Sequence, residues 1–158
     1  MSPDSQPHHR RSIRLKGYDY SQAGAYYVTI LTYQRDRFLG EIVNHEMHLN
    51  LFGKIVLQTW NNLPRHYPHL KLGAFVIMPD HVHGILILDD NPQCIVRHGI
   101  PEIVRALKTF SARRINRLCG SEGIPVWQRN YYEHIIRNDK DMERIVRYIE
   151  TNPLRWDK

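Results

Sequence analysis

The sequence predicts an α+β domain of the ferredoxin-like, split βαβ class: an antiparallel sheet with helices on one face, plus a C-terminal helix. Strand and helix patterns follow one another in the order β-α-β-β-α-β-α, and the first six match the split βαβ arrangement. The 158 residues, 42% hydrophobic and 24% charged, suit one globular domain with a single core. In this arrangement we expect the first and third strands to be central.

The first half of the chain supplies one strand, an inserted hairpin and one helix. Residues 26–33 are rich in β-branched and aromatic side chains, which favour a strand. Residues 41–43 and 47–49 flank a turn and predict the hairpin. Residues 51–63 carry apolar side chains at helical spacing, and we expect the prolines that follow to end this helix.

The middle of the chain supplies two strands and a second helix. Residues 72–78 and 82–88 are strongly apolar, and the Pro79-Asp80 pair between them is typical of a tight turn. A helix is predicted over 101–118, because proline is favoured at the first helical position.

The last elements are a strand over 131–136 and a helix over 138–151. Asn138 and Asp141 have the spacing of a capping box, which marks the start of that helix. Pro153 limits its other end.

The chain carries a formal net charge of +6, which favours a polyanionic partner, most often nucleic acid. We predict a flexible basic arm over residues 1–20 and a single domain over residues 21–158. Beside Tyr18 and Tyr20, such an arm can enter a groove or stack on an unpaired base. The arm contains four candidate DNA-binding cations: Arg10, Arg11, Arg14 and Lys16.

The location of the protein is predicted from three absences in the sequence. No apolar run approaches the roughly eighteen residues of a membrane span. The N-terminus lacks the apolar core of a signal peptide. Cys94 and Cys119 form no paired motif, which fits a reducing compartment. We therefore predict a cytoplasmic protein with no membrane partner.

Two histidines lie at the start of the apolar strand predicted over 82–88, one directly before it and one within it. His81 and His83 are two residues apart, so a strand presents both on one face, while Val82 points into a core. Two imidazoles side by side suit a divalent metal ion. The alternative is a buried pair whose nitrogens are satisfied by backbone carbonyls.

The last predicted helix places a tyrosine at the border of its apolar stripe. Arg144 lies one turn before Tyr148 and Asn152 one turn after it, on the same side. A phenol flanked by a guanidinium and an amide is a candidate nucleophile, and Arg144 is a candidate DNA contact. The alternative is a half-buried tyrosine with its hydroxyl at the surface.

The helix predicted over 101–118 carries a basic face opposite its apolar side. Such a stripe suits a phosphate backbone, and the alternative is a merely solvated face. The candidate DNA-binding residues on this helix are Arg105, Lys108, Arg113, Arg114 and Arg117.

Three motifs in order resemble a known family. They lie at residues 78–83 (MPDHVH), 127–138 (WQRNYYEHIIRN) and 148–153 (YIETNP). This pattern is similar to that of the single-tyrosine HUH transposases, and within them to the REP-associated tyrosine transposases of bacteria. Residues 11–20 also resemble the start of that branch.

The resemblance implies an enzyme that cuts and rejoins single-stranded DNA beside hairpins. It implies that His81 and His83 bind Mg²⁺ or Mn²⁺ and that Tyr148 forms a 5′-phosphotyrosine intermediate. The third metal ligand maps to Asn152, which can instead cap the helix because a residue before proline is pushed out of helical geometry. It also implies a bacterial, nucleoid-associated protein whose basic arm helps to read a single-stranded guide sequence.

Two other functions stay open from the sequence. A ferredoxin-like sheet can bind single-stranded nucleic acid by stacking, with no catalysis. A domesticated regulator can keep DNA binding and lose cutting. The sequence leaves both a monomer and a homodimer open.

Overall fold

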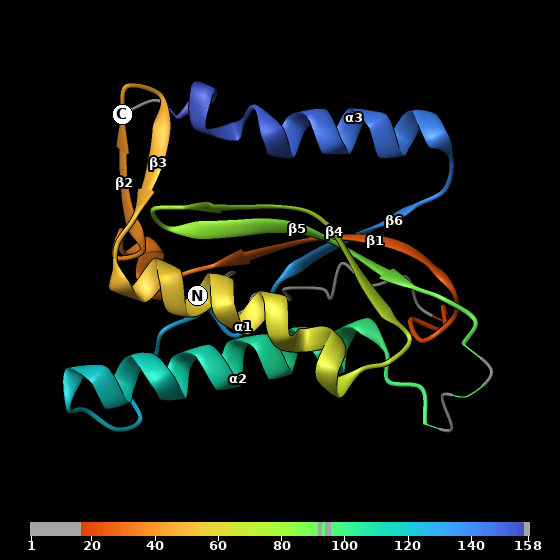
Figure 1. Ribbon diagram of the computed structural model, residues 1–158, viewed down its shortest axis with the longest axis horizontal. Helices are drawn as coiled ribbons and strands as arrows, with labels where there is room; N and C mark the ends of the chain where they lie inside the picture. The colour runs from red at the N-terminus through yellow and green to blue at the C-terminus, as the bar shows by residue number, and fades with distance from the viewer. Residues whose placement is uncertain (1–16, 92, 94–95, 157–158) are drawn as a thin grey trace, which may run out of the picture.

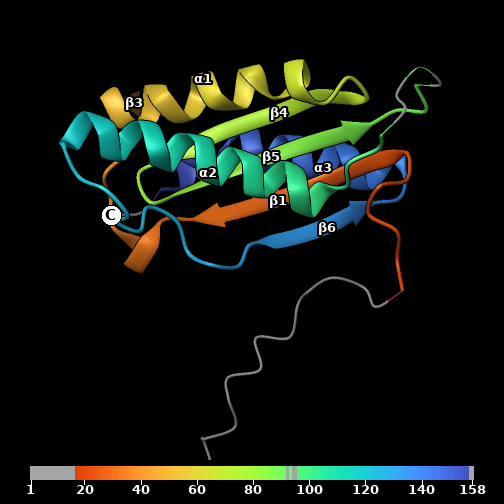
Figure 2. The same cartoon turned by 90° about the horizontal axis from the view of Figure 1, so that it is seen from below.

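The computed structural model describes residues 17–91, 93 and 96–156. Its main sheet has the order β4-β5-β1-β6, and every neighbouring pair is antiparallel. As predicted, the first and third of the four main strands, β1 and β5, are the central pair (Figure 2). The four strands are β1 (Gly24–Leu31), β4 (Leu70–Met78), β5 (His81–Leu88) and β6 (Tyr132–Ile136).

Helices cover both faces of this sheet. α1 (Leu51–His66) and α2 (Ile100–Cys119) lie side by side on one face, and α3 (Asp139–Glu150) lies alone on the other (Figure 1). The structure thus confirms the ferredoxin-like prediction with its additional C-terminal helix. Within the described residues, no helix is long and apolar enough to cross a membrane.

Three short elements lie at one end of the sheet. The predicted hairpin is present as β2 (Gly40–Val43) and β3 (Glu46–Leu49). Two 3-10 turns, η2 (Tyr33–Arg35) and η3 (Asn152–Arg155), follow β1 and α3. Figure 1 shows the hairpin rising at the end of the sheet where α3 stops.

Two local expectations about helix ends need correction. α1 continues through Pro64 to His66, because a proline in the last turn removes one helical hydrogen bond while the N–H of Tyr67 still bonds the carbonyl of Leu63. At the start of α3, Asn138 accepts a hydrogen bond from the N–H of Asp141, as a cap should. The Asp141 carboxylate, however, bonds His134 rather than returning to Asn138.

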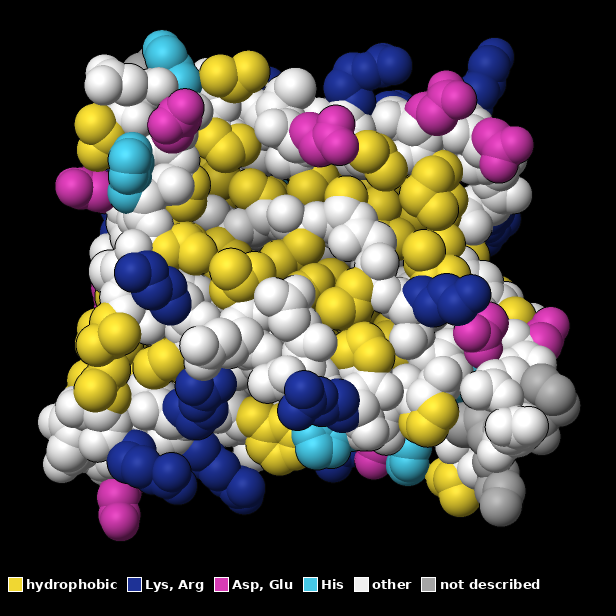
Figure 3. Space-filling model, in the orientation of Figure 1, with side chains coloured by type: hydrophobic (Ala, Val, Ile, Leu, Met, Phe, Trp, Pro, Cys, Tyr) yellow, Lys and Arg dark blue, Asp and Glu magenta, His cyan; other side chains and the backbone are white. Residues whose placement is uncertain are grey.

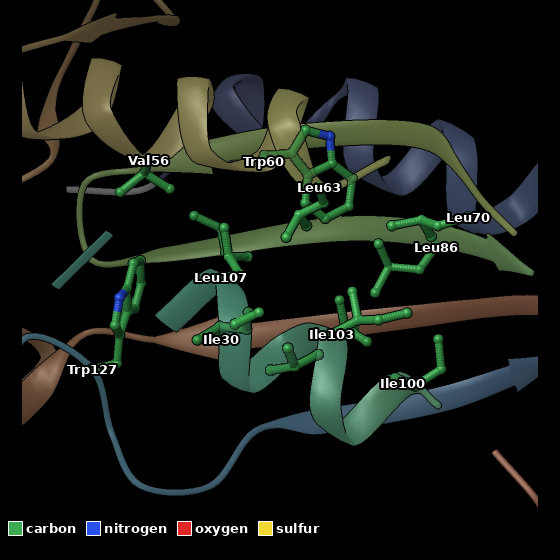
Figure 4. Packing of buried hydrophobic residues seen from close by; sticks show 14 of the residues in the cluster. Ile30, Val56, Trp60, Leu63, Leu70, Leu86, Ile100, Ile103, Leu107 and Trp127 are labelled. Carbon is green, nitrogen blue, oxygen red and sulfur yellow. The ribbon is translucent and has the colours of Figure 1, made fainter. Parts of the chain in front are cut away.

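The two faces of the sheet bury different side chains. Val82 of β5 joins the main core, as predicted. Ile30 of β1 belongs to the same core and lies near Ile103 and Leu107 of α2 (Figure 4). The odd-numbered residues of β5 point to the other face of the sheet, where Ile85 packs with Ile145 and Ile149 of α3. The strand period therefore sends His81 and His83 to the α3 side.

A close contact of Trp60 with the sheet depends on Gly84. The rings of Trp60 and Phe75 stack with centroids 4.0 Å apart, and a Cβ at residue 84 would lie 2.5 Å from the Trp60 ring. We expect Gly84→Ala to reduce the free energy of unfolding by about 1–3 kcal/mol, because the indole must move out of a packed core. Urea denaturation measures this free energy.

An unchanged stability of Gly84→Ala would show that the Trp60 ring shifts freely. When Gly84→Ala is combined with Phe75→Ala, we expect the loss in free energy of unfolding to be smaller than the sum of the two separate losses.

The start of the described chain is packed rather than extended into solvent. Tyr20 is buried, and the Tyr18 ring contacts the rings of Tyr20 and Tyr26. Tyr18 and Tyr20 therefore pack against neighbouring rings, and the division into an arm over residues 1–20 and a domain over residues 21–158 stays a prediction. The cations Arg10, Arg11, Arg14 and Lys16 lie outside the described residues, as does Cys94.

Candidate active site

The two histidines of β5 lie together under α3. Their ring centroids are 4.6 Å apart, and both residues are buried. His83 lies opposite Thr29 of β1 and Val76 of β4 in the register, so it occupies the middle of the sheet.

Each imidazole is held through its Nδ1 atom. His81 Nδ1 lies 2.6 Å from the Asp80 carboxylate, and His83 Nδ1 lies 2.8 Å from the hydroxyls of both Tyr27 and Thr29. Such contacts fix the orientation of a ring, as outer partners do for metal-binding histidines, and the Asp80 carboxylate also favours the His81 tautomer with its proton on Nδ1. They leave the Nε2 side of each ring to face a ligand.

A further residue holds Asp80. The Arg35 guanidinium forms an ion pair with the Asp80 carboxylate at 2.9 Å. Arg35 reaches this position from η2, where Gln34 and Arg35 have φ values of 55° and 57°, uncommon for residues other than glycine. The sequence patterns place Asp80 in a turn and in the motif at residues 78–83, and they do not point to Arg35, Tyr27 or Thr29. Strand register would have revealed the last two, since both lie near His83 on β1.

Burial favours the neutral form of both imidazoles. Burial lowers the pKa of His81, although the Asp80 carboxylate opposes this shift. Burial, with smaller effects from His81 and from Arg155, lowers the pKa of His83 to about 3. A neutral imidazole is the form that binds metal ions.

The lowered pKa of His83 makes the fold sensitive to acid. Between pH 6.5 and about 3 the unfolded chain binds a proton at His83 that the folded chain does not, so stability falls as the pH falls through this range. The slope is at most about 1.4 kcal/mol per pH unit. Urea unfolding in EDTA at pH 7.5 and 5.0 is expected to show a smaller loss for His83→Asn than for the wild type. An equal loss in both would contradict this prediction.

Tyr148 of α3 meets the histidine pair within the same chain. Its ring centroid lies 5.4 Å from that of His83. The side chain is 41% exposed, so a reactant in solvent can reach it. The structure thus brings Tyr148 next to histidines that lie 65 (His83) and 67 (His81) positions earlier in the sequence.

Two residues after α3 complete the surroundings of Tyr148. The Arg155 guanidinium lies 4.2 Å above the Tyr148 ring and donates to the Tyr148 carbonyl at 2.6 Å. Asn152 is buried and donates to the same carbonyl at 3.4 Å, and its side chain acts to raise the pKa of the nearby His81 imidazole. Arg144, by contrast, pairs with Asp141. The sequence analysis named Asn152 and Arg144 but missed Arg155.

The histidine pair and Asn152 form a small donor set for a cation. Among the described residues, no group of three or more His, Cys, Asp and Glu side chains is placed to hold a metal ion. The two imidazoles nevertheless lie side by side with Asn152 near His81, and burial favours their neutral form. This set fits a divalent ion that completes its coordination with substrate oxygens.

The basic residues of α2 lie on the far side of the sheet from this site. Figure 3 shows Lys and Arg side chains gathered along the lower edge of the molecule, where α2 lies in Figure 1. Lys108 donates to the Arg129 carbonyl, and burial lowers its pKa, while Arg114 donates to Gln58. The exposed cations of this helix are Arg105, Arg113 and Arg117.

The fold and the site define a class: a ferredoxin-like sheet whose paired histidines face a tyrosine from a C-terminal helix. Residues 27–152 match the family model described as "Transposase IS200 like". The match spans most of the sequence, and the chain belongs to the IS200-like transposase family.

Curated relatives add a narrower likeness, to REP-associated tyrosine transposases. A Haemophilus influenzae protein named "Uncharacterized protein" is 40% identical over 170 residues, which cover 96% of this chain and 92% of that one. A second, described as a candidate REP-associated tyrosine transposase, is 29% identical over 146 residues, covering 87% and 74%. The REP-associated tyrosine transposase of Escherichia coli K12 is 31% identical over 90 residues, covering 56% and 48%. They confirm the resemblance found in the sequence.

Two solved structures share the fold. A REP-associated tyrosine transposase bound to a REP hairpin matches with a TM-score of 0.64 and 22% identity, over 89% of this chain and 73% of that one. A candidate transposase from Deinococcus radiodurans matches with a TM-score of 0.54 and 24% identity, over 87% and 95%. At these identities the likeness concerns the fold.

Proposed function

We propose that this protein is a metal-dependent endonuclease and strand transferase for single-stranded DNA, acting through a 5′-phosphotyrosine at sites flanked by hairpins. The observation that carries the proposal is the Tyr148 ring 5.4 Å from His83, with both imidazoles anchored beneath it. The hairpin as substrate is supported by a transposase of the same fold that binds a REP hairpin.

The metal site consists of His81, His83 and Asn152 in this proposal. A bound Mn²⁺ or Mg²⁺ withdraws charge from the phosphate oxygens and so favours nucleophilic attack. Histidine suits Mn²⁺ better than Mg²⁺, which prefers oxygen ligands. Asp80 and the hydroxyls of Tyr27 and Thr29 keep both Nε2 atoms directed at the substrate.

Tyr148 is the nucleophile. Its hydroxyl oxygen forms a bond to phosphorus while the bond from phosphorus to the 3′ oxygen breaks. The phenol loses its proton, and the departing 3′ oxygen gains one. The phosphotyrosine keeps the energy of the broken ester bond, so a second 3′-hydroxyl can reverse the step and join a new strand. Because the histidines and Tyr148 meet within one chain, a monomer can carry out both steps.

Arg155 orients the phenol in this mechanism. The Arg155 guanidinium covers one face of the Tyr148 ring and donates a hydrogen bond to the Tyr148 carbonyl. These two contacts hold the Tyr148 hydroxyl in a fixed direction. We expect Arg155→Gln to lower the rate of adduct formation roughly tenfold to hundredfold, with DNA affinity changed much less. Single-turnover kinetics with prebound DNA measure this. Partial recovery in Arg155→Lys is expected, and an unchanged rate in Arg155→Gln would exclude the role.

The exposed cations of α2 supply a second, separate surface for DNA. Arg105, Arg113 and Arg117 lie on the face opposite the candidate site, where a paired hairpin stem can be held while its unpaired flank passes Tyr148. The basic arm predicted over residues 1–20 is a further candidate for that flank.

A denaturing gel separates this proposal from a binding module. The protein is incubated with labelled hairpin oligonucleotides whose single-stranded flanks are randomised, in Mn²⁺ or in EDTA. We expect a band that survives denaturation in Mn²⁺ and is absent in EDTA, and sequencing of its DNA gives the cleavage site. A shift on a native gel with no surviving band in either condition would favour a module or regulator that binds without cutting.

A further inference from the structure

A groove opens beside the candidate active site, and the mechanism above does not use it. It lies between the β2–β3 hairpin, the turn at Pro79 and Trp156, and we call it the hairpin groove. Its cavity of about 590 Å³ falls in the range of ligand sites. Arg37, Glu41 and His48 are among the side chains that line it.

Trp156 connects this groove to the histidines. Its ring stacks on that of His81, with centroids 6.3 Å apart and planes 30° apart. The His81 ring in turn lies 4.6 Å from His83, which faces Tyr148. A strand with a phosphate at the histidine pair thus places an adjacent nucleotide at Trp156.

The groove offers the groups that bind an unpaired nucleotide. Trp156 is a partly exposed aromatic ring, whereas Trp60 and Trp127 are buried in the core. The Arg37 guanidinium lies 4.9 Å from the centre of the Trp156 ring. An aromatic platform with an adjacent cation is the usual arrangement for single-stranded nucleic acid, because bases stack and phosphates pair with guanidinium groups.

The charges in the groove also give the nucleotide a direction. Glu41 contributes a carboxylate to the lining on β2, where a phosphate would be repelled. Carboxylates accept hydrogen bonds from the amino groups of bases. With its base near Glu41 and its phosphate near Arg37, the nucleotide gives the carboxylate a hydrogen-bond donor and the guanidinium an anion.

We propose that the hairpin groove binds the nucleotide of single-stranded DNA adjacent to the cleaved phosphate, with its base on Trp156 and its phosphate on Arg37. The inference rests on the proposed function for the position of the strand. The base takes the ring face over which Arg37 now lies, and the guanidinium moves to the phosphate. The groove then holds the nucleotide on one side of the cleaved phosphate, both before and after Tyr148 attacks that phosphate.

Tryptophan fluorescence tests this proposal without cleavage. Single-stranded octamers of dA or dC are titrated into the Tyr148→Phe protein in Mn²⁺, with affinity followed by anisotropy of labelled DNA. We expect quenching of the exposed indole and roughly tenfold weaker binding on Trp156→Ala, because stacking on aromatic rings contributes strongly to such complexes. Arg37→Gln is expected to weaken binding severalfold and reduce its salt dependence. Arg65→Gln, an exposed change on α1, serves as the matched control.

The outcomes separate this proposal from the proposed function. Quenching that disappears in Trp156→Phe, with Arg65→Gln unaffected, supports the groove even if the wild-type protein forms no covalent adduct. A covalent adduct in the wild type, with no quenching and unchanged affinity in Trp156→Ala and Arg37→Gln, overturns the groove and leaves the proposed function standing.

Discussion

Replacing Tyr148 with phenylalanine is expected to abolish the covalent adduct with DNA, with a fall in cleavage rate of at least roughly a thousandfold. The change removes the hydroxyl that we propose as the attacking group and keeps the ring, so the contacts with His83 and Arg155 persist. The fold and the affinity for uncut DNA should therefore change little. Denaturing gels measure the adduct, and anisotropy of labelled DNA measures the affinity.

The controls for this prediction come from β6 and the residue before it. Tyr132 is 54% exposed and Tyr131 donates to the Glu133 carboxylate, so phenylalanine at either position keeps the packing of the ring. Both variants are expected to form the adduct at the wild-type rate. An adduct that persists in Tyr148→Phe and disappears in Tyr131→Phe or Tyr132→Phe would transfer the nucleophile to another residue.

Loss of the histidine pair is expected to have the second largest effect. In His81→Asn combined with His83→Asn, we expect cleavage to fall by roughly a hundredfold or more, because neither imidazole remains to hold the ion that neutralises the phosphate. Binding of Mn²⁺, followed by electron paramagnetic resonance, should weaken in parallel. DNA binding in EDTA should be unchanged, which separates the metal role from general damage.

Asp80→Asn provides the graded comparison. The amide keeps the shape of the carboxylate but loses the charge that bonds His81 and Arg35. Removal of such an outer partner typically lowers metal affinity tenfold to a hundredfold. An unchanged Mn²⁺ affinity in the double histidine variant would show that the pair is structural, the alternative left open by the sequence.

The histidine pair was predictable because strand geometry is simple. The two-residue period of β5 places His81 and His83 on one face and Val82 on the other, and the structure has this arrangement. The order of strand and helix patterns likewise predicted the sheet with β1 and β5 at its centre. Both inferences need only local periodicity and the known split βαβ order.

The remaining site residues depend on features that local patterns do not encode. Arg155 and Trp156 follow Pro153, where the chain leaves α3 and no periodic pattern indicates its direction. Arg35 reaches Asp80 through a backbone conformation that is uncommon for arginine. On α2 the pattern predicted a basic face, but Lys108 and Arg114 are half-buried and donate hydrogen bonds to neighbouring groups. Which cations stay free depends on tertiary contacts.

The small apolar cluster under α3 has a consequence for how the protein loses activity. Ile145 and Ile149 are the buried apolar residues of this helix, whereas α1 and α2 share the extensive main core. Elements with few buried contacts open at lower free energy than the rest of a domain. Mild heat or dilute denaturant should then detach the nucleophile from the histidines while the sheet and its two larger helices stay intact. Inactivation would follow this local opening, well before the melting transition.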